Sequence, residues 1–515
     1  MPKRTFVYGA MILLAANLFN RILGFLYQYL IMTYLGGEVY GLFNMVFPLY
    51  MMALVLTTAG IPLAVSKLVS EEISLGRPRQ AEAIFRIAVT LLASLGAFVS
   101  IVLYFFSPFF TERLFPDIRV LKIFQICAPA IFIVSFASAF RGYFQGLQNM
   151  LPTALSQIAE QIVRITVGFS AALYFFPRGT EWAAAGLAIG MLAGEAVGLL
   201  SIGSQFFLIR KSFSFPAIRS ESVSLRPLLL KLWRLATPVT AGRLLASGLS
   251  ALDALIIPQR LRAAGYTVQE AATLYGQLGG TGFTLLSFPS VFTFSLATSL
   301  LPSISEAAAH KQMNQVRVRS TEALRLTVLL GLPCLIIIFY FSYPLAAFFK
   351  SANIAPVLRI LALGGLFTYL QQTTNGILQG LGKMHLPVIH SLIAACIRLP
   401  LLVYLTGRPA YGLTGCALAY VAGFISVASL NLLALSRLTG LPLNFRDFVL
   451  QPGVAGLVML LIFKLLTPLL PDQPFVFPVT MAAGLAGYIL TLAGNGGLSR
   501  KDLCRIPWLG KFISR

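Results

Sequence analysis

Charged side chains are scarce in this chain of 515 residues. Asp, Glu, Lys and Arg make up 11% of the sequence and hydrophobic residues 57%, whereas about a quarter of a soluble globular protein is charged. Apolar runs of about 20 residues, the length that an α-helix needs to cross a bilayer, recur from one end of the chain to the other. The short alternating segments of a membrane β-barrel are missing. The sequence therefore predicts an all-α polytopic membrane protein.

Acidic residues are fewer than basic residues. The chain has 17 Asp and Glu against 39 Lys and Arg, which gives a formal net charge of +22. The basic residues are spread over the loops and do not form a soluble basic domain, so we expect no binding of nucleic acid. The charge balance indicates instead basic cytoplasmic loops and attraction to anionic membrane lipids.

Residues that commonly carry out chemistry are also few. The chain has 3 His and 5 Cys, without the paired spacings of a metal site or a disulfide framework. It contains no nucleotide-binding loop and no nucleophile elbow. We therefore expect no metal, no cofactor and no enzymatic activity, and transport could not draw on ATP hydrolysis by the chain itself.

The apolar runs and the residues that break them predict about fourteen membrane-spanning helices. We assign spans one to six to an N-terminal lobe at 1–225 and spans seven to twelve to a C-terminal lobe at 226–440. The last two spans and a basic tail occupy 441–515.

Basic residues gather in alternate loops and at both ends of the chain. The richer set includes Arg77, Arg79, Lys311, Lys501 and Lys3. The opposite loops hold fewer, such as Arg113 and Arg178. Because Lys and Arg are enriched in cytoplasmic loops, we expect a multi-pass protein of the cell membrane with both termini in the cytoplasm.

The two halves of the chain repeat each other. Short matches occur in the same order and lie about 230 to 240 residues apart, as in a duplicated transporter fold. They pair Tyr40-Gly41 with Tyr275-Gly276, Gln145-Gly146-Leu147 with Gln379-Gly380-Leu381, and Gly186-Leu187-Ala188 with Gly415-Cys416-Ala417. An even number of spans in each half gives the halves the same orientation, so the repeat is parallel.

Ionisable residues inside the spans are candidate functional residues, because a charge in the bilayer is costly. The basic ones are Arg21, Arg164, Arg243 and Arg398. The repeat places Arg21 and Arg243 early in their halves, and Arg164 and Arg398 in the fifth span of each. Guanidinium groups bind phosphate in a bidentate manner and stay protonated. Arginines that converge on a cavity between the lobes would therefore suit an anionic, pyrophosphate-bearing substrate.

A purely structural role for the same residues stays open. Each arginine could pair with a carboxylate or extend to the membrane surface, and Glu160 and Arg164 lie four residues apart on one helical face. Asp253 and Glu195 are the other candidates for charge partners or for coupling groups. The amides of Asn20, Gln145 and Gln379 could bind a sugar or join helices.

Two stretches of the chain resemble a known family. They are Asn20-Arg21-Ile22-Leu23-Gly24-Phe25 and Gly60-Ile61-Pro62-Leu63-Ala64-Val65-Ser66-Lys67-Leu68-Val69. They look like the stage V sporulation protein B group of the multidrug/oligosaccharidyl-lipid/polysaccharide exporter superfamily, which is related to the lipid II flippases. Arg21 matches the arginine of the flippases' Ser-Arg-Val-Leu-Gly-Phe motif. Tyr27-Gln28 stand where those flippases carry an Arg-Asp pair, which favours the sporulation-type branch.

The resemblance implies a mechanism. Two six-helix lobes would enclose a central cavity and expose it alternately to the two sides of the membrane. The substrate would be an undecaprenyl-pyrophosphate-linked oligosaccharide or a peptidoglycan precursor, moved with coupling to an ion gradient or to the membrane potential. Proteins of cell-wall synthesis would be its partners.

Two other functions fit the same sequence. A multidrug/cation antiporter of the superfamily would expose carboxylates in its cavity, because its substrates are cationic. A non-transporting membrane partner of cell-wall synthesis would have a packed interior in which every arginine is paired.

Overall fold

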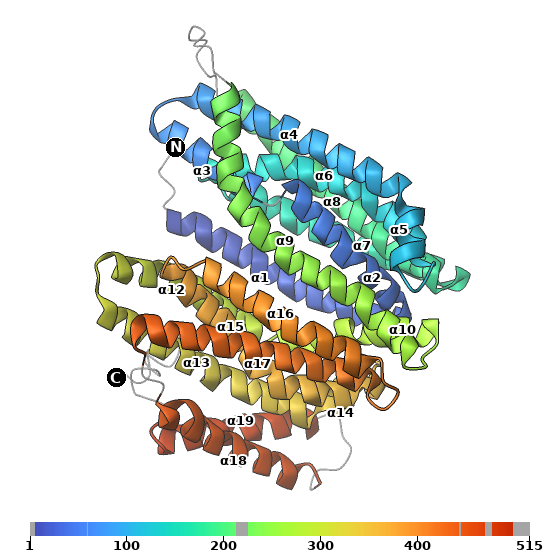
Figure 1. Ribbon diagram of the computed structural model, residues 1–515, viewed down its shortest axis with the longest axis vertical. Coiled ribbons are helices and arrows are strands. Elements are labelled where there is room, and N and C mark those ends of the chain that lie inside the picture. Colours follow the sequence, from blue (N-terminus) through green and yellow to red (C-terminus); the bar gives the residue numbers. More distant parts are fainter. Residues whose placement is uncertain (1–5, 59, 213–224, 442–443, 469–475, 498–515) are drawn as a thin grey trace. The chain divides into compact units, whose positions relative to one another are not determined.

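The computed structural model describes residues 6–58, 60–212, 225–441, 444–468 and 476–497. Within these ranges every regular element is a helix and none is a strand (Figure 1). The prediction of an all-α membrane protein is confirmed. By its contacts the chain divides into two compact units, Met1–Gly280 and Thr281–Arg515, and each unit is described by itself.

The first unit contains the longer N-terminal series of helices. They are α1 (Phe6–Leu30), η1 (Ile31–Leu35), α2 (Gly36–Thr58), α3 (Ile61–Ser74), α4 (Pro78–Phe105), α5 (Ser107–Leu114), α6 (Val120–Gly146), α7 (Leu151–Phe175), η2 (Phe176–Arg178), α8 (Thr180–Ser212), α9 (Leu225–Ala263) and α10 (Val268–Gln277). Local sequence explains several boundaries. Gly36, at a φ of 87°, turns the chain between η1 and α2. A capping box of Thr267 and Glu270 starts α10.

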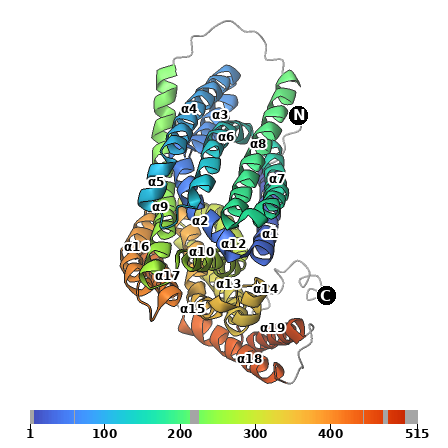
Figure 2. The ribbon, with the colours of Figure 1, turned by 90° about the vertical axis from the view of Figure 1, so that its right-hand side faces the viewer.

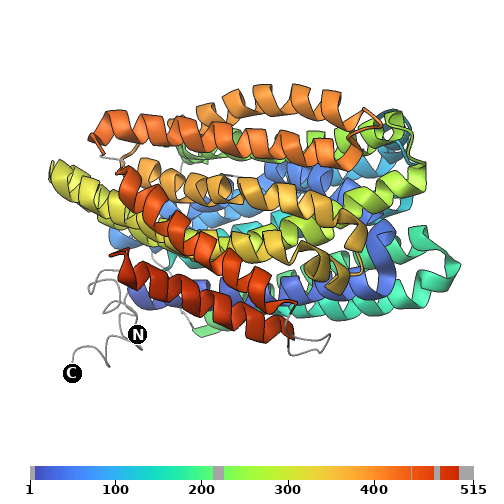
Figure 3. The ribbon, with the colours of Figure 1, turned by 90° about the horizontal axis from the view of Figure 1, so that it is seen from below.

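The second unit follows η3 (Leu278–Phe283), in which the division between the units falls. Its helices are α11 (Thr284–Ser287), α12 (Ser290–Ala309), α13 (Met313–Tyr340), α14 (Ser342–Phe348), η4 (Ala352–Ile354), α15 (Ala355–Gly380), α16 (His385–Thr406), α17 (Gly412–Thr439), η5 (Arg446–Leu450), α18 (Gln451–Leu466) and α19 (Val476–Gly494). The last pair, α18 and α19, lie side by side (red in Figure 3).

The described residues include 12 helical stretches that are long and apolar enough to cross a membrane, or 13 if the bent pair Val268–Ser287 and Ser290–Ala309 counts as one more. The first of these stretches, Ala15–Ser74, is 60 residues long and contains the turn at Gly36. One crossing needs only about 20 residues. The number of about fourteen spans stays a prediction.

The boundary between the two compact units, after Gly280, differs from the boundary at 225 that the repeat predicts. The repeat assigns α9 and α10 to the beginning of the second lobe, but they pack against α2, and α9 also packs against α3. The lobe limits expected at 225 and 440 therefore stay a prediction.

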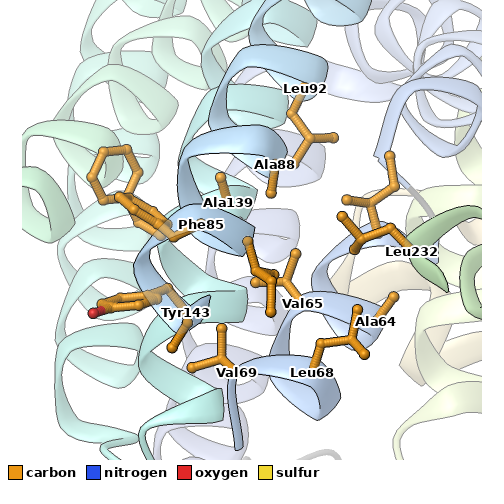
Figure 4. Packing of buried hydrophobic residues seen from close by; sticks show 14 of the residues in the cluster. Ala64, Val65, Leu68, Val69, Phe85, Ala88, Leu92, Ala139, Tyr143 and Leu232 are labelled. Carbon is orange, nitrogen blue, oxygen red and sulfur yellow. The ribbon is translucent and has the colours of Figure 1, made fainter. Parts of the chain in front are cut away.

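An apolar core joins α3, α4, α6 and α9 in the first unit. Val65 and Val69 of α3, Ala88 of α4 and Leu232 of α9 are buried together (Figure 4). The Phe85 ring lies 4.6 Å from the Tyr143 ring, centroid to centroid, and so ties α4 to α6. These contacts bury the apolar side of α3, which is one of the shorter helices.

The same glycine contacts recur in both units. A methyl group on Gly142 of α6 would lie 2.7 Å from the carbonyl oxygen of Pro62 of α3. In the second unit, one on Gly376 of α15 would lie 2.8 Å from the carbonyl oxygen of Ala297 of α12. A turn further along, Gly146 and Gly380 approach α3 and α12 in the same way. Two helices of each half thus cross at equivalent positions of the repeat.

A second close crossing joins α2 to α10. A methyl group on Gly41 would overlap the carbonyl oxygen of Ala272, and one on Gly276 would overlap the carbonyl oxygen of Gly37. Gly41 and Gly276 are partners in the repeat. The contact is therefore reciprocal, as it is in an isologous interface about a two-fold axis.

We expect Gly146→Leu and Gly380→Leu to destabilise the protein to a similar extent. Each side chain would be forced into a neighbouring helix backbone, and overpacking of this kind costs about 1–3 kcal/mol or more. Thermal unfolding of the purified variants in detergent measures the loss. Gly203→Leu on α8 is the control, because nothing lies within 4 Å of a methyl group there. Equal stability of all three variants would contradict the tight crossings.

Candidate functional site

A chain of alternating charges lies between α6, α7 and α8. Arg164 donates from one nitrogen to Glu160, one turn earlier on α7, and to Glu195 of α8, both at 2.6 Å. Arg141 of α6 donates to the other oxygen of Glu160 at 2.8 Å. The side chains of Glu160 and Glu195 are only 13% and 8% exposed. Two positive and two negative charges therefore neutralise one another inside the protein.

Glycines of α8 bring this helix close enough to complete the chain of charges. Gly190, Gly194 and Gly198 recur every fourth residue and face α7. A methyl group on Gly194 would lie 2.8 Å from the carbonyl oxygen of Glu160. The two helices consequently run side by side (Figure 2), and Glu195 reaches Arg164 from the next helix.

A cavity of about 290 Å³ opens beside this chain of charges, between α1, α2, α7 and α8. Arg164 forms part of its wall. Three amide side chains and four aromatic rings line it as well: Gln28, Asn44, Gln161, Tyr27, Tyr40, Phe43 and Phe47. Of the cavity's residues the sequence had singled out only Arg164 as a site residue. Two more, Tyr27 and Gln28, could have been found from the sequence, because they stand where this chain differs from the flippase motif.

Some polar atoms of α1 and α7 are buried without a hydrogen bond to the described residues. They are the hydroxyl of Tyr27 and Nε of Arg164 in the cavity wall, together with Oδ1 of Asn20 on α1 and Oε1 of Gln157 on α7. A buried group without a partner costs about 1–3 kcal/mol. These four atoms expose almost no surface, so they add to the cost of packing α1 against α7.

The other predicted site residues of the first unit lie outside this wall. Arg21 on α1 and Arg243 on α9 are exposed, whereas Asp253 on α9 is 8% exposed. Gln145 is half-buried near the end of α6. The structure thus brings Arg164, Glu160 and Glu195 together, and the convergence of all four arginines on one cavity stays a prediction.

In the second unit Arg398 of α16 occupies the place of Arg164. A methyl group on Gly423 of α17 would lie 2.8 Å from Cδ of Arg398. In the first unit, a methyl group on Gly194 would lie similarly close to the side chain of Arg164. The guanidinium of Arg398 lies over the ring of Tyr420, 4.7 Å from the centroid. Arg398 is 9% exposed, and Gln379 on α15 is exposed. The repeat therefore preserves the arginine and the glycine but changes the surroundings.

The second unit contains a buried polar cluster around His390 and Asn431, two residues that the sequence had not indicated. His390 of α16 lies 2.7 Å from Oδ1 of Asn431 on α17. The amide nitrogen of Asn431 donates to Thr374 and Asn375 of α15. Together these bonds tie α15, α16 and α17 to one another.

A second set of charges in the first unit lies at the start of α6, around Arg119. Arg119 donates to Asp117 and, at 2.6 Å, to Glu38 of α2. The hydrogen bond with Asp117, followed by that with Glu38, raises the pKa of Arg119 above its usual value. Arg119 also donates to Thr180. This group fastens α2 and α8 to the start of α6.

Residues 6–308 match the polysaccharide biosynthesis protein family, and residues 279–404 match the MatE family. Over the full length of both proteins the chain is 31% identical to stage V sporulation protein B of Bacillus subtilis (strain 168). The chain belongs to the polysaccharide transporter family of the multidrug/oligosaccharidyl-lipid/polysaccharide exporter superfamily. The resemblance drawn from the 20–25 and 60–69 stretches is confirmed.

Further relatives of this polysaccharide transporter family member agree with the assignment. Lipid II flippase MurJ of Bacillus subtilis (strain 168) is 26% identical over 81% of this chain and 82% of its own length. The fold is similar to that of a solved lipid II flippase MurJ in an inward closed conformation, with a TM-score of 0.71 at 17% identity over 94% of this chain and 98% of that one. It is also similar to an inward-facing multidrug MATE transporter, with a TM-score of 0.65 at 16% identity over 82% and 94% of the chains.

The family settles the general role of the protein. It is a multi-spanning membrane transporter of the flippase and exporter type, located in the cell membrane, and a lipid II flippase is among its relatives.

We expect the chain of charges to be strongly coupled. Arg164→Ala leaves Glu160 and Glu195 buried next to each other, and loss of one partner of a buried pair costs about 3–5 kcal/mol. The double variant Arg164→Ala/Glu195→Ala should therefore lose less stability than the sum of the single variants. Thermal or denaturant unfolding in detergent measures the cycle.

The matched control is the exposed pair of Lys67 and Glu71, which lies on α3 at 3.8 Å. Surface pairs contribute about 0–1 kcal/mol, so Lys67→Ala should change stability little. Additive effects of Arg164→Ala and Glu195→Ala would contradict the coupling.

Proposed function

We propose that this transporter moves an undecaprenyl-pyrophosphate-linked oligosaccharide or a peptidoglycan precursor across the cell membrane by alternating access. The lipid II flippase among its relatives supports this substrate class. The observation that carries the proposal is the distribution of charge within the spans. Arg21 and Arg243 are exposed, whereas Glu160, Glu195 and Asp253 are largely buried.

This distribution favours an anionic substrate. Glu160 and Glu195 neutralise Arg141 and Arg164 between α6, α7 and α8. The two candidate charges that are exposed, Arg21 on α1 and Arg243 on α9, are both positive. A pyrophosphate fits two guanidinium groups, because each can donate two parallel hydrogen bonds to phosphate oxygens. A cation antiporter would present the opposite sign. The cavity beside α1 also argues against a packed, non-transporting partner of cell-wall synthesis.

In the proposed cycle Arg21 and Arg243 hold the pyrophosphate while the prenyl chain stays in lipid. The bound anion compensates their charge, which lowers the cost of carrying the head group through the membrane interior. An ion gradient or the membrane potential supplies the energy, and anionic lipids and proteins of cell-wall synthesis surround the transporter. Both termini lie in the cytoplasm, as the basic loops predict.

We expect Arg21→Ala and Arg243→Ala each to reduce flipping about tenfold or more, because a charged hydrogen-bonded contact with phosphate is worth about 1.5–3 kcal/mol. Arg21→Lys should recover part of the activity, since lysine keeps the charge but not the bidentate geometry. Proteoliposomes that contain a fluorescent lipid-linked precursor, with an impermeant quencher outside, measure the rate.

Arg178→Ala, at an exposed position of η2, is the control for a general loss of positive charge. Full flipping by both Arg21→Ala and Arg243→Ala, at normal levels of inserted protein, would exclude these residues from the site.

The proposed orientation makes a separate prediction. In a background that lacks the native cysteines, Arg178→Cys should react with an impermeant maleimide in intact cells, and Arg79→Cys only after the membrane is opened. Arg79 lies in the first turn of α4, among the residues of the basic set, and Arg178 lies in η2, among the residues of the opposite set. The reverse labelling pattern would place the termini outside the cell.

A further inference from the structure

The cavity between α1, α2, α7 and α8 is small. At about 290 Å³ it lies at the lower end of the range of about 300–1,000 Å³ that is usual for small-molecule sites. A single ring with its substituents fits this volume, whereas a prenyl chain or a longer oligosaccharide does not. All of its wall belongs to the first unit.

The wall combines flat apolar surfaces with groups that both donate and accept hydrogen bonds. Tyr27, Tyr40 and Phe43 supply aromatic rings, which present apolar faces. Amide side chains, among them Gln28 and Gln161, carry a donor and an acceptor each. A pyranose has the complementary surface, because its C–H groups form apolar faces and its hydroxyls donate and accept around the edge.

The charge of the wall favours a neutral ligand. Arg164 is the cation that contributes to it, and its guanidinium already donates to Glu160 and Glu195. A pyrophosphate placed here would approach two carboxylates that are 2.6 Å from that guanidinium, and like charges at such distances repel. Sugar hydroxyls meet no such opposition.

The position of the cavity along α1 connects it to the exposed Arg21. Gly24 and Gln28 follow Arg21 at spacings of three and seven residues, which places all three on one side of the helix. An α-helix rises about 1.5 Å per residue, so Gly24 lies about 5 Å and Gln28 about 10 Å from Arg21 along the helix axis. A sugar attached directly to a pyrophosphate spans this distance.

We propose that this cavity receives the first sugar ring of the head group, the one joined to the pyrophosphate. The inference rests on the proposed function, because it takes Arg21 as the group that holds the pyrophosphate. It adds a site that recognises neutral sugar inside the first unit, separate from the cationic site for the phosphates. The transporter then distinguishes a glycosylated lipid from the bare lipid pyrophosphate.

Gly24 permits a direct test. The nearest atom to a methyl group on Gly24 is Nε2 of Gln161, at 3.8 Å, so a larger side chain there extends beside the amide and occupies the cavity. The probes are undecaprenyl pyrophosphate and undecaprenyl-pyrophosphoryl-N-acetylglucosamine. Native mass spectrometry of the purified full-length protein titrated with each lipid gives the two dissociation constants.

We expect the unmodified protein to bind the glycosylated lipid about tenfold more tightly, and Gly24→Leu to lose this preference while it binds undecaprenyl pyrophosphate as before. Gln161→Met, which keeps the side-chain length but removes the amide, should weaken only the glycosylated lipid. Gly203→Leu is the matched control, because its site on α8 is open, and it should change neither constant.

Three results would contradict the sugar site or the proposed function. If the unmodified protein shows no preference, or if Gly24→Leu and Gln161→Met both retain it, the sugar site is wrong and the proposed function stands. If the unmodified protein neither binds nor flips either lipid, the proposed function itself fails. A loss of fold in Gly24→Leu is detected by its unfolding temperature, and Gln161→Met then decides.

Discussion

The buried chain of charges from Arg141 through Glu160 and Arg164 to Glu195 constrains the rest of the first unit. Charges can remain inside a membrane protein only if each has a partner, since breaking one pair costs about 3–5 kcal/mol. That requirement holds α6, α7 and α8 at a fixed spacing, and the glycines of α8 provide it. The position of α7 in turn determines one wall of the cavity beside α1.

The candidate charged residues of the first unit divide into a buried group and an exposed group. The acidic residues of the spans in this unit are largely buried, and the exposed Arg21 and Arg243 stand on helices at its surface. One unit therefore offers two kinds of surface, a cationic one for an anion and a largely apolar cavity, with amide groups in its wall, for an uncharged ring. A lipid-linked pyrophosphate with a sugar head group has both kinds of chemistry within a short length.

The two halves share a scaffold but not a chemistry. Gly142 and Gly376, like Gly194 and Gly423, make equivalent close contacts in the two units. The arginine at the equivalent position pairs with carboxylates in one unit and lies over Tyr420 in the other. Duplication of a backbone arrangement thus allows one half to acquire a polar site without disturbing the packing of both.

Much of the fold could be predicted from the sequence, because apolar length and helical spacing are local properties. They gave the all-α membrane class, the repeat and the pairing of Glu160 with Arg164, four residues apart on one helix. Helical spacing contains no information about neighbours on other helices. The contacts of Arg164 with Glu195 and of Glu160 with Arg141, and a cavity assembled from α1, α2, α7 and α8, were therefore decided only by the tertiary packing.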